Sequence, residues 1–256
     1  MLSVFYESYA VASAEVSKLR RDPTELFSRA VQPVLWLVVF GQVFSAVRGI
    51  PTGQLRYLDY MAPGILAQSI LFSSIFYGIA IIWERDLGIV HKLLVTPAHR
   101  SALVLGKAFA AALRGLVQAA VVYLIAVALH VSVRLEPLAI VTVICSVFVG
   151  SCIFSTFSLV IACIVKTRER FMGIGQVLTM PLFFASNAIY PLELMPPWLK
   201  GLAAINPLTY LVDTLRGAMI VGGTSSYAMT TSFGVMIAVF AVLLSVAARL
   251  YPSLAR

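Results

Sequence analysis

Six stretches of this sequence contain no Asp, Glu, Lys or Arg, and each approaches or exceeds the length of a membrane crossing. They cover residues 30–47, 60–83, 115–133, 137–165, 171–192 and 217–248. A transmembrane helix needs about 20 apolar residues, and Gly222–Gly223 breaks the last stretch, so its crossing is expected to begin near residue 228. The pattern predicts an all-α polytopic membrane protein whose six transmembrane helices span about 27–47, 59–83, 110–133, 137–165, 171–191 and 228–249.

The composition favours the same fold class. Hydrophobic residues make up 60% of the 256 residues, charged residues make up 12%, and the mean hydropathy is +0.94. A soluble domain of this size could not bury so much apolar surface, so lipid must be part of its solvent. The net charge of +8 then indicates basic loops that face anionic lipid rather than nucleic acid. We expect one transmembrane domain over residues 1–256.

The distribution of basic residues predicts the orientation. With the N-terminus inside, 14 of the 19 Lys and Arg residues face the cytoplasm. The five that face outward are Arg48, Arg56, Arg134, Lys200 and Arg216. This asymmetry agrees with the positive-inside rule and predicts a multi-pass protein with both termini in the cytoplasm.

The segment before the first stretch has a helical period of its own. Apolar residues recur every three or four positions over residues 1–21, opposite Glu7, Glu15 and Lys18. This pattern predicts an amphipathic helix lying in the membrane interface. Asp22 and Pro23 are then suited to begin a second helix.

Charge is concentrated in the loop between the second and third stretches. The segment WERDLGIVHKLLVTPAHRSALVLGK, residues 83–107, carries six formal charges and two of the chain's three histidines. Residues 84–95 are expected to form a short helix, which Gly88 weakens by about 1 kcal/mol relative to Ala. Thr96 and Pro97 are suited to begin the next helix.

The chain between Lys200 and Asp213 is uncharged but too short to cross a membrane. Pro196–Pro197 would begin one short helix, and Asn206 would cap a second with Pro207 at its first position. Asp213 and Arg216 can pair on the second helix because they are three residues apart. Two short amphipathic helices over about 192–222 predict a re-entrant hairpin on the outer side; an interfacial loop resting on lipid is the alternative.

Motifs for chemistry within this chain are missing from the sequence. It has no phosphate-binding loop of the form G-x-x-x-x-G-K-[ST], no H-E-x-x-H and no G-x-S-x-G. Its three cysteines, Cys145, Cys152 and Cys163, are too far apart along one helix to bridge or to share a metal. We therefore expect no catalytic residues, no metal site and no cofactor bound by this chain.

Two motifs resemble those of a known family. The segment from Trp83 to Lys107 and the segment IYPLELMPPWLKGLAAINPLTYLVDTLRG, Ile189 to Gly217, are similar to the type-2 ABC-exporter permeases, which include drug-resistance permeases of the daunorubicin type. The resemblance extends over essentially the whole chain. It implies the transmembrane subunit of an ATP-driven exporter in a prokaryotic plasma (inner) membrane. ATP and Mg would bind a separate ATPase subunit, and a second permease, identical or related, would complete the pathway.

The resemblance also implies roles for particular residues. The loop after the second span would be a coupling helix that docks into the ATPase subunit, and the hairpin would close the outer end of the pathway. The residues implied for ATPase coupling are Glu84, Arg85, Asp86, Gly88, Lys92, Thr96, Pro97 and Arg100, and those implied for the outer gate are Asn206, Pro207, Asp213 and Arg216. Without the resemblance, these loop charges could equally solvate the loop and contact lipid headgroups.

Aromatic stripes suggest where a cargo would pass. Trp36, Phe40 and Phe44 recur at i, i+4 and i+8, and a similar face carries Phe72, Phe76 and Tyr77. Such stripes most often pack against other helices. If they line a pathway, they suit an apolar or amphipathic cargo such as a drug, a lipid or a lipid-linked glycan.

Two other functions stay open on the sequence. An ion-coupled secondary transporter would need ionisable groups near the bilayer midplane, and Arg114 is the best candidate. The 19 uncharged residues that follow Arg114 would span about 28 Å as a helix, so we expect Arg114 at the cytoplasmic edge. A membrane scaffold that transports nothing is the other alternative.

Overall fold

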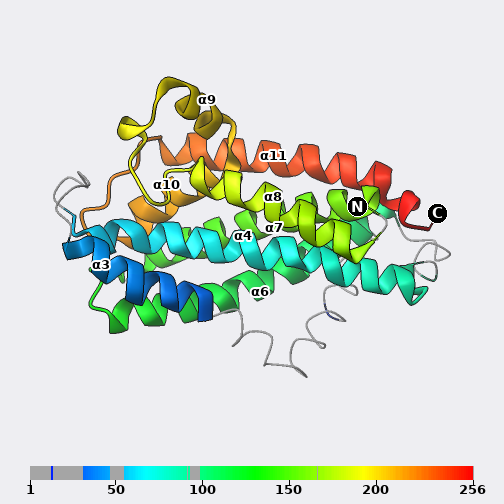
Figure 1. The fold of residues 1–256 in the computed structure, drawn as a ribbon, viewed down its shortest axis with the longest axis horizontal. Helices are drawn as coiled ribbons and strands as arrows, with labels where there is room; N and C mark the ends of the chain where they lie inside the picture. The colour runs from blue at the N-terminus through cyan, green and yellow to red at the C-terminus, as the bar shows by residue number, and fades with distance from the viewer. Residues whose placement is uncertain are drawn as a thin grey trace.

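The computed structural model describes residues 13, 31–46, 55–90, 92, 99–165 and 167–255, and these are almost entirely helical (Figure 1). Apart from Ser13, the expected interfacial helix 1–21 lies outside the described residues, as do Thr96 and Pro97. The helical segment 31–46 contains η1 (Trp36–Phe40), a π-helical turn, and α3 (Gly41–Ala46). The remaining elements are α4 (Tyr57–Asp86), α6 (Arg100–Ala128), α7 (Pro137–Ile164), α8 (Arg168–Phe184), η2 (Leu192–Leu194), α9 (Pro197–Ile205), α10 (Pro207–Met219), α11 (Met229–Leu250) and η3 (Tyr251–Ala255).

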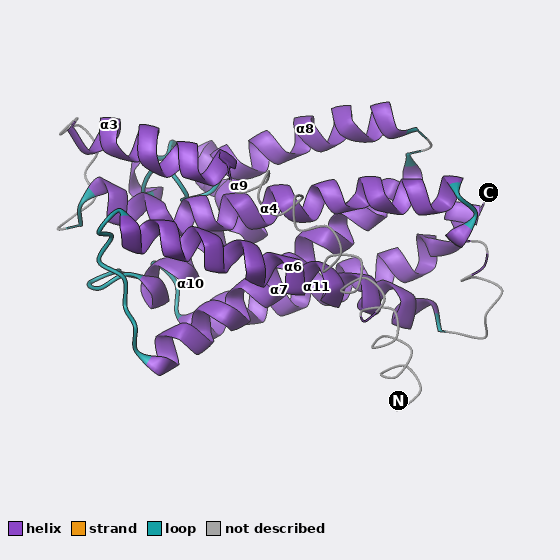
Figure 2. Cartoon of the chain, turned by 90° about the horizontal axis from the view of Figure 1, so that it is seen from below, coloured by secondary structure: helices purple, strands orange, loops and turns teal. Residues whose placement is uncertain are grey.

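Four of these helices are long and apolar enough to cross a membrane: α4, α6, α7 and the helix that begins with α11. Helix α7 lies at the centre and packs against α4, α6, α10 and α11. Figure 2 shows α3 and α8 on the same side of α4. The core between them is built from Leu, Ile, Val and Ala side chains of α4, α6, α7 and α10. The helical fold class is thus confirmed.

The number of crossings stays a prediction. The segment 31–46 contributes only a short apolar helix, Val31–Val43. Helix α8 has 17 residues, which extend about 26 Å and fall short of the roughly 30 Å hydrocarbon thickness. The sequence placed this crossing at 171–191, but α8 ends at Phe184 and residues 185–190 form turns.

Close packing on α4 explains where these turns lie. A Cβ at Gly64 would sit 2.2 Å from the carbonyl oxygen of Ala188, so only glycine admits this approach of the backbone. The hydroxyl of Tyr60 donates to the carbonyl of Asn187 over 3.2 Å, and that of Tyr57 to Ile189 over 3.3 Å. The segment after α8 therefore packs along the first turns of α4 instead of continuing the helix.

Helix α6 begins close to the expected start but ends early. A helix was expected to begin near Pro97 and to cross the membrane over 110–133; α6 begins at Arg100 and ends at Ala128. Only 14 residues follow Arg114 in the helix, about 21 Å, so Arg114 lies midway along α6 rather than at an edge. Its guanidinium lies 4.8 Å from the centre of the Tyr77 ring. Arg114 thus contacts protein, and its position at the cytoplasmic edge of the membrane stays a prediction.

The bundle has two distinct ends (Figure 1). The charged end comprises the last turn of α4, the first turns of α6 and α8, and the end of α11. The hairpin end comprises the start of α4, the loop 129–136, and α9 and α10. At the hairpin end Val133 and Ile220 form an isolated antiparallel bridge, which joins the α6–α7 loop to the chain after α10.

Candidate coupling site and transport pathway

The aromatic side chains of the expected pathway do not share one face. Trp36 stacks on Phe40 with ring centroids 4.4 Å apart, and the Phe72 and Phe76 rings lie 6.5 Å apart. Tyr77 faces elsewhere, because it is buried beneath Arg114. The Phe44 side chain lies outside the described part of the chain.

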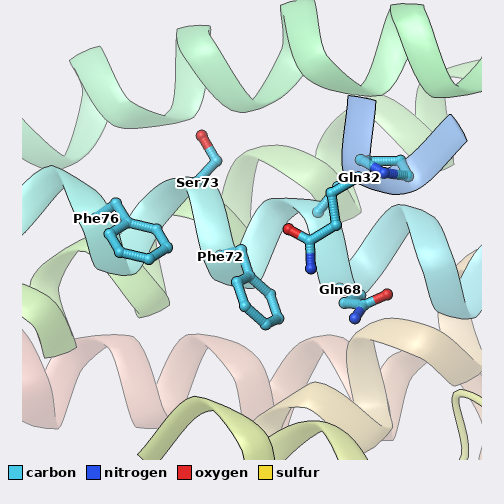
Figure 3. Close-up of a pocket in the computed structure, with 7 residues that line it drawn as sticks. Gln32, Gln68, Phe72, Ser73 and Phe76 are labelled. Atoms are coloured by element: carbon cyan, nitrogen blue, oxygen red, sulfur yellow. The ribbon is translucent and has the colours of Figure 1, made fainter. Parts of the chain in front are cut away.

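A pocket separates the segment 31–46 from α4. Its volume is about 200 Å³, and both Phe72 and Phe76 line it (Figure 3). Two amide side chains that the sequence reading missed, Gln32 and Gln68, share this lining. The pocket therefore has both apolar and hydrogen-bonding walls.

The expected outer gate is built largely as the sequence indicated. The Asn206 side chain accepts a hydrogen bond from the Leu208 amide over 3.0 Å and caps α10, with Pro207 as its first residue. The Asn206 amide also donates to the carbonyl of Leu182 over 2.7 Å. These two bonds attach the start of α10 to the end of α8.

Asp213 does not pair with Arg216, and each serves a different neighbour. Asp213 is fully buried and accepts hydrogen bonds from Ser225 (2.6 Å) and from the amides of Ser226 (2.7 Å) and Tyr227 (3.0 Å). Its carboxylate thus holds the loop between α10 and α11 against the bundle.

Arg216 is bound by the turns after α8 and by α4. It donates to the Asn187 carbonyl over 2.6 Å, and its guanidinium lies 3.8 Å from the centre of the Tyr60 ring. Burial lowers the pKa of Arg216, while the nearby Tyr60, Asp213 and Glu193 oppose this shift. Arg216 therefore links three elements at the hairpin end: α10, α4 and the turns after α8.

At the charged end, a buried ion pair joins α4 to α6. The ammonium nitrogen of Lys107 lies 2.5 Å from a carboxylate oxygen of Glu84. Glu84 is 7% exposed and Lys107 is 3% exposed. Glu84 is therefore part of the junction between two long helices, directly before the loop for which the resemblance implies docking. Lys107 belongs to the GK dipeptide of the motif. The opposite signs of the Lys107 and Glu84 charges were the only indication of this pair in the sequence.

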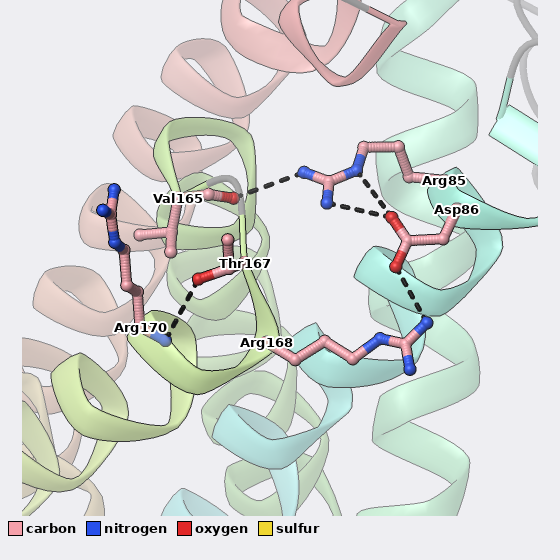
Figure 4. A network of polar contacts seen from close by, with 6 residues as sticks. All are labelled: Arg85, Asp86, Val165, Thr167, Arg168 and Arg170. Atoms are coloured by element: carbon pink, nitrogen blue, oxygen red, sulfur yellow. Dashed lines mark hydrogen bonds and ion pairs between the residues drawn. The ribbon is translucent and has the colours of Figure 1, made fainter.

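A second, more exposed network joins α4 to the junction of α7 and α8 (Figure 4). Asp86 lies 2.8 Å from Arg168 and 3.0 Å from Arg85, and Arg85 also reaches the carbonyl of Val165 over 3.4 Å. The Arg168 guanidinium lies 3.5 Å from the centre of the Trp83 ring. Single exposed ion pairs contribute little, but a network with a stacked guanidinium orders the end of the helix better than one pair does.

The expected helix 84–95 is interrupted. Glu84, Arg85 and Asp86 belong to the last turn of α4, which ends at Asp86. Gly88 has φ of +72°, a left-handed conformation that terminates helices, and its amide donates to the Arg85 carbonyl over 2.9 Å. Gly88 is therefore the break after α4 and not a weak point within a helix.

The described part of the loop presents both buried and exposed side chains. Val90 is fully buried, whereas Lys92 and Arg100, at the start of α6, are exposed. Leu87, just before the break, is 67% exposed. The loop thus offers an apolar side chain and basic side chains at the tip of two helices that are joined by a buried ion pair.

The described residues contain neither a metal-binding cluster nor a disulfide. No three His, Cys, Asp or Glu side chains there lie close enough to hold a metal ion. The three cysteines are unpaired. The polar contacts described at the charged end and the hairpin end hold neighbouring helices and loops in place.

A sequence profile described as ABC-2 type transporter matches residues 6–220. The chain belongs to this family. It is 31% identical over 202 residues to the putative transport permease ycf38 of Cyanophora paradoxa, covering 78% of this chain and 69% of that protein. It is 24% identical over 216 residues to the inner membrane transport permease YadH of Escherichia coli K12, covering 81% and 80%.

A third relative carries a name that mentions a drug. The permease is 26% identical over 204 residues to the probable doxorubicin resistance ABC transporter permease protein DrrC of Mycobacterium tuberculosis, covering 79% of this chain and 72% of that protein. The resemblance drawn from the two motifs is therefore confirmed. The permease is a membrane-spanning transport subunit of an ABC transporter, a family that works with an ATPase subunit.

Proposed function

We propose that this permease is the membrane half of an ATP-driven exporter and that the loop after α4 receives force from a separate ATPase subunit. ATP and Mg would bind that subunit. A second permease, identical or related, would complete the pathway, and the cargo would be apolar or amphipathic. Both termini would face the cytoplasm, because most basic residues of the described chain lie at or near the charged end.

The observation that carries the proposal is the pairing of Glu84 with Lys107 behind an exposed loop. A push on Leu87 or Lys92 would act on the end of α4, and the buried ion pair would pass the displacement to α6. The contacts of Asp86 and Arg85 would carry it to the start of α8. A loop that only solvated its charges would need no such connection to three helices.

The family argues against ion coupling. ABC-2 permeases are transport subunits of ABC transporters, so an ATPase partner is the expected energy source. Arg114 lies midway along α6 but faces Tyr77, so it gives no specific support to a proton or sodium pathway. Transport that continued without any ATPase subunit would contradict the proposal.

Reversing the chemistry of the loop is expected to uncouple the complex. Leu87→Asp with Lys92→Glu should reduce ATPase-driven transport by at least tenfold, because both side chains would contact the ATPase subunit. Since both residues are exposed, the free energy of unfolding should change by no more than about 0.5 kcal/mol. Transport into proteoliposomes and co-purification of the ATPase subunit would be measured together.

The matched control is Leu135→Asp. Leu135 is 67% exposed, as Leu87 is, but lies in the loop between α6 and α7 at the hairpin end. This variant should co-purify with the ATPase subunit as the unmodified permease does. Equal binding and transport in the Leu87, Lys92 variant would rule out docking at this loop.

A further inference from the structure

The pocket between the segment 31–46 and α4 contains an amide group for which the described residues supply no hydrogen-bond partner. Gln68 is 3% exposed, and within the described parts of the chain its carboxamide makes no hydrogen bond, although it lines the pocket. Buried polar groups are nearly always hydrogen-bonded, and an unpaired amide inside a bilayer is especially unfavourable. A group that enters the pocket would supply the missing partner.

A second amide lies across the pocket. Gln32, from the segment 31–46, reaches toward α4 and approaches the space beside Gln68 and Phe72 (Figure 3). Each carboxamide offers both a donor and an acceptor, which is the combination that a hydroxyl group can satisfy in either direction. The two amides therefore favour a ligand with several hydroxyl or similar groups.

The walls of the pocket also limit the charge and size of the ligand. No ionisable residue is among the described side chains that line it, so a charged group would lose its hydration without gaining a counter-charge. Phe72 and Phe76 provide apolar ring surface. The volume of about 200 Å³ is below the roughly 300–1,000 Å³ of sites that enclose a drug-sized molecule, so the pocket fits one ring-sized group.

We infer that this pocket binds a neutral, hydroxyl-bearing ring of the cargo, such as one sugar unit of an amphipathic glycoside, between Gln32, Gln68 and the Phe72–Phe76 wall. The inference rests on the proposed function, because it treats the pocket as part of the transport pathway. It adds the chemical class that the pathway selects. Charged amphiphiles with the same apolar tail are excluded.

The experiment measures binding to the full permease in nanodiscs without the ATPase subunit. The chain has three tryptophans, and Trp83→Phe with Trp198→Phe leaves Trp36, one turn beyond Gln32, as its single tryptophan, which is excited selectively at wavelengths where tyrosine does not absorb. Three probes with the same tail are titrated below their micelle concentrations: octyl β-D-glucoside, octyltrimethylammonium and octyl sulfate. The shared tail makes partition into lipid a common background.

We expect a saturable change in Trp36 fluorescence for the glucoside alone. Gln32→Leu with Gln68→Leu should raise the Kd of the glucoside by about tenfold or more, because each lost hydrogen bond weakens binding severalfold. Gln176→Leu is the control, since Gln176 is exposed on α8 outside the pocket. Gln32→Leu alone should show part of the effect, and its exposed position makes misfolding an insufficient explanation.

Equal binding of the three probes, tighter binding of a charged probe, no saturable binding, or an unchanged Kd in the double variant would each overturn the inference. None of these outcomes concerns the ATPase subunit. Uncoupling in the loop variants with no glucoside selectivity would leave the proposed function standing and remove only this site. Glucoside selectivity without ATPase coupling would support this site and contradict the proposed function.

Discussion

Lys107→Met is expected to lower the free energy of unfolding by about 3–5 kcal/mol. The substitution removes the cation that lies 2.5 Å from the buried Glu84 carboxylate, and removing one partner of a buried ion pair is strongly destabilising. Denaturation of the purified permease, followed by circular dichroism over a range of denaturant concentrations, measures this loss.

A variant that lacks both charges distinguishes the loss of the ion pair from the cost of burying one charge alone. Glu84→Gln with Lys107→Met should recover most of the lost stability, because replacing a buried pair by neutral groups is often nearly neutral. The double variant should still transport less per ATP, since its α4–α6 junction lacks the ion pair. Lys200→Met, at an exposed position on α9, is the control and should leave stability unchanged. Additive losses in the double variant would show that the two side chains do not act as a pair.

Asp213→Ala is expected to destabilise the hairpin end by about 2–6 kcal/mol. The backbone amides of Ser226 and Tyr227 both lose a charged acceptor, and each lost hydrogen bond costs roughly 1–3 kcal/mol. The loss should be local, so amide hydrogen exchange at residues 225–227 should accelerate far more than exchange in α7. Mass spectrometry after exchange in nanodiscs measures both regions in one sample.

Two further variants test whether the lost carboxylate causes the faster exchange. Asp213→Asn keeps one oxygen acceptor and should lose less stability than the alanine variant. Glu193→Ala removes an exposed carboxylate at the same end of the bundle and should leave the exchange of residues 225–227 unchanged. Uniformly faster exchange along the whole chain after Asp213→Ala would contradict a local role for this carboxylate.

If the hairpin closes the outer end of the pathway, as the resemblance implies, the loop between α10 and α11 is where the hairpin would be released. Asp213 holds the loop after α10, and Arg216, three residues later on the same helix, holds the turns after α8. A movement of α10 therefore shifts both attachments together. The buried α10 would respond as one unit, since Asn206 also fixes its first turn to Leu182.

The sequence by itself determined the helical class, the positions of the long helices and the family. These depend on information local to the chain: apolar runs long enough to cross a bilayer, the Asn206–Pro207 start of α10, and two contiguous motifs. A helix satisfies its backbone hydrogen bonds within itself, so its presence can be read from a short window.

Only the tertiary structure decided which side chains meet. Lys107 reaches Glu84 across 23 residues and Arg168 reaches Asp86 across 82, and both contacts depend on the rotation and relative height of packed helices. Helix packing also determines that Asp213 binds the loop after α10 instead of Arg216. It determines that α8 ends where Gly64 admits the backbone of Ala188. The position of Arg114 midway along α6 likewise came from the structure. Such contacts have no local signal, because a helix with the same sequence could pair its charges with any neighbour that packing brings within reach.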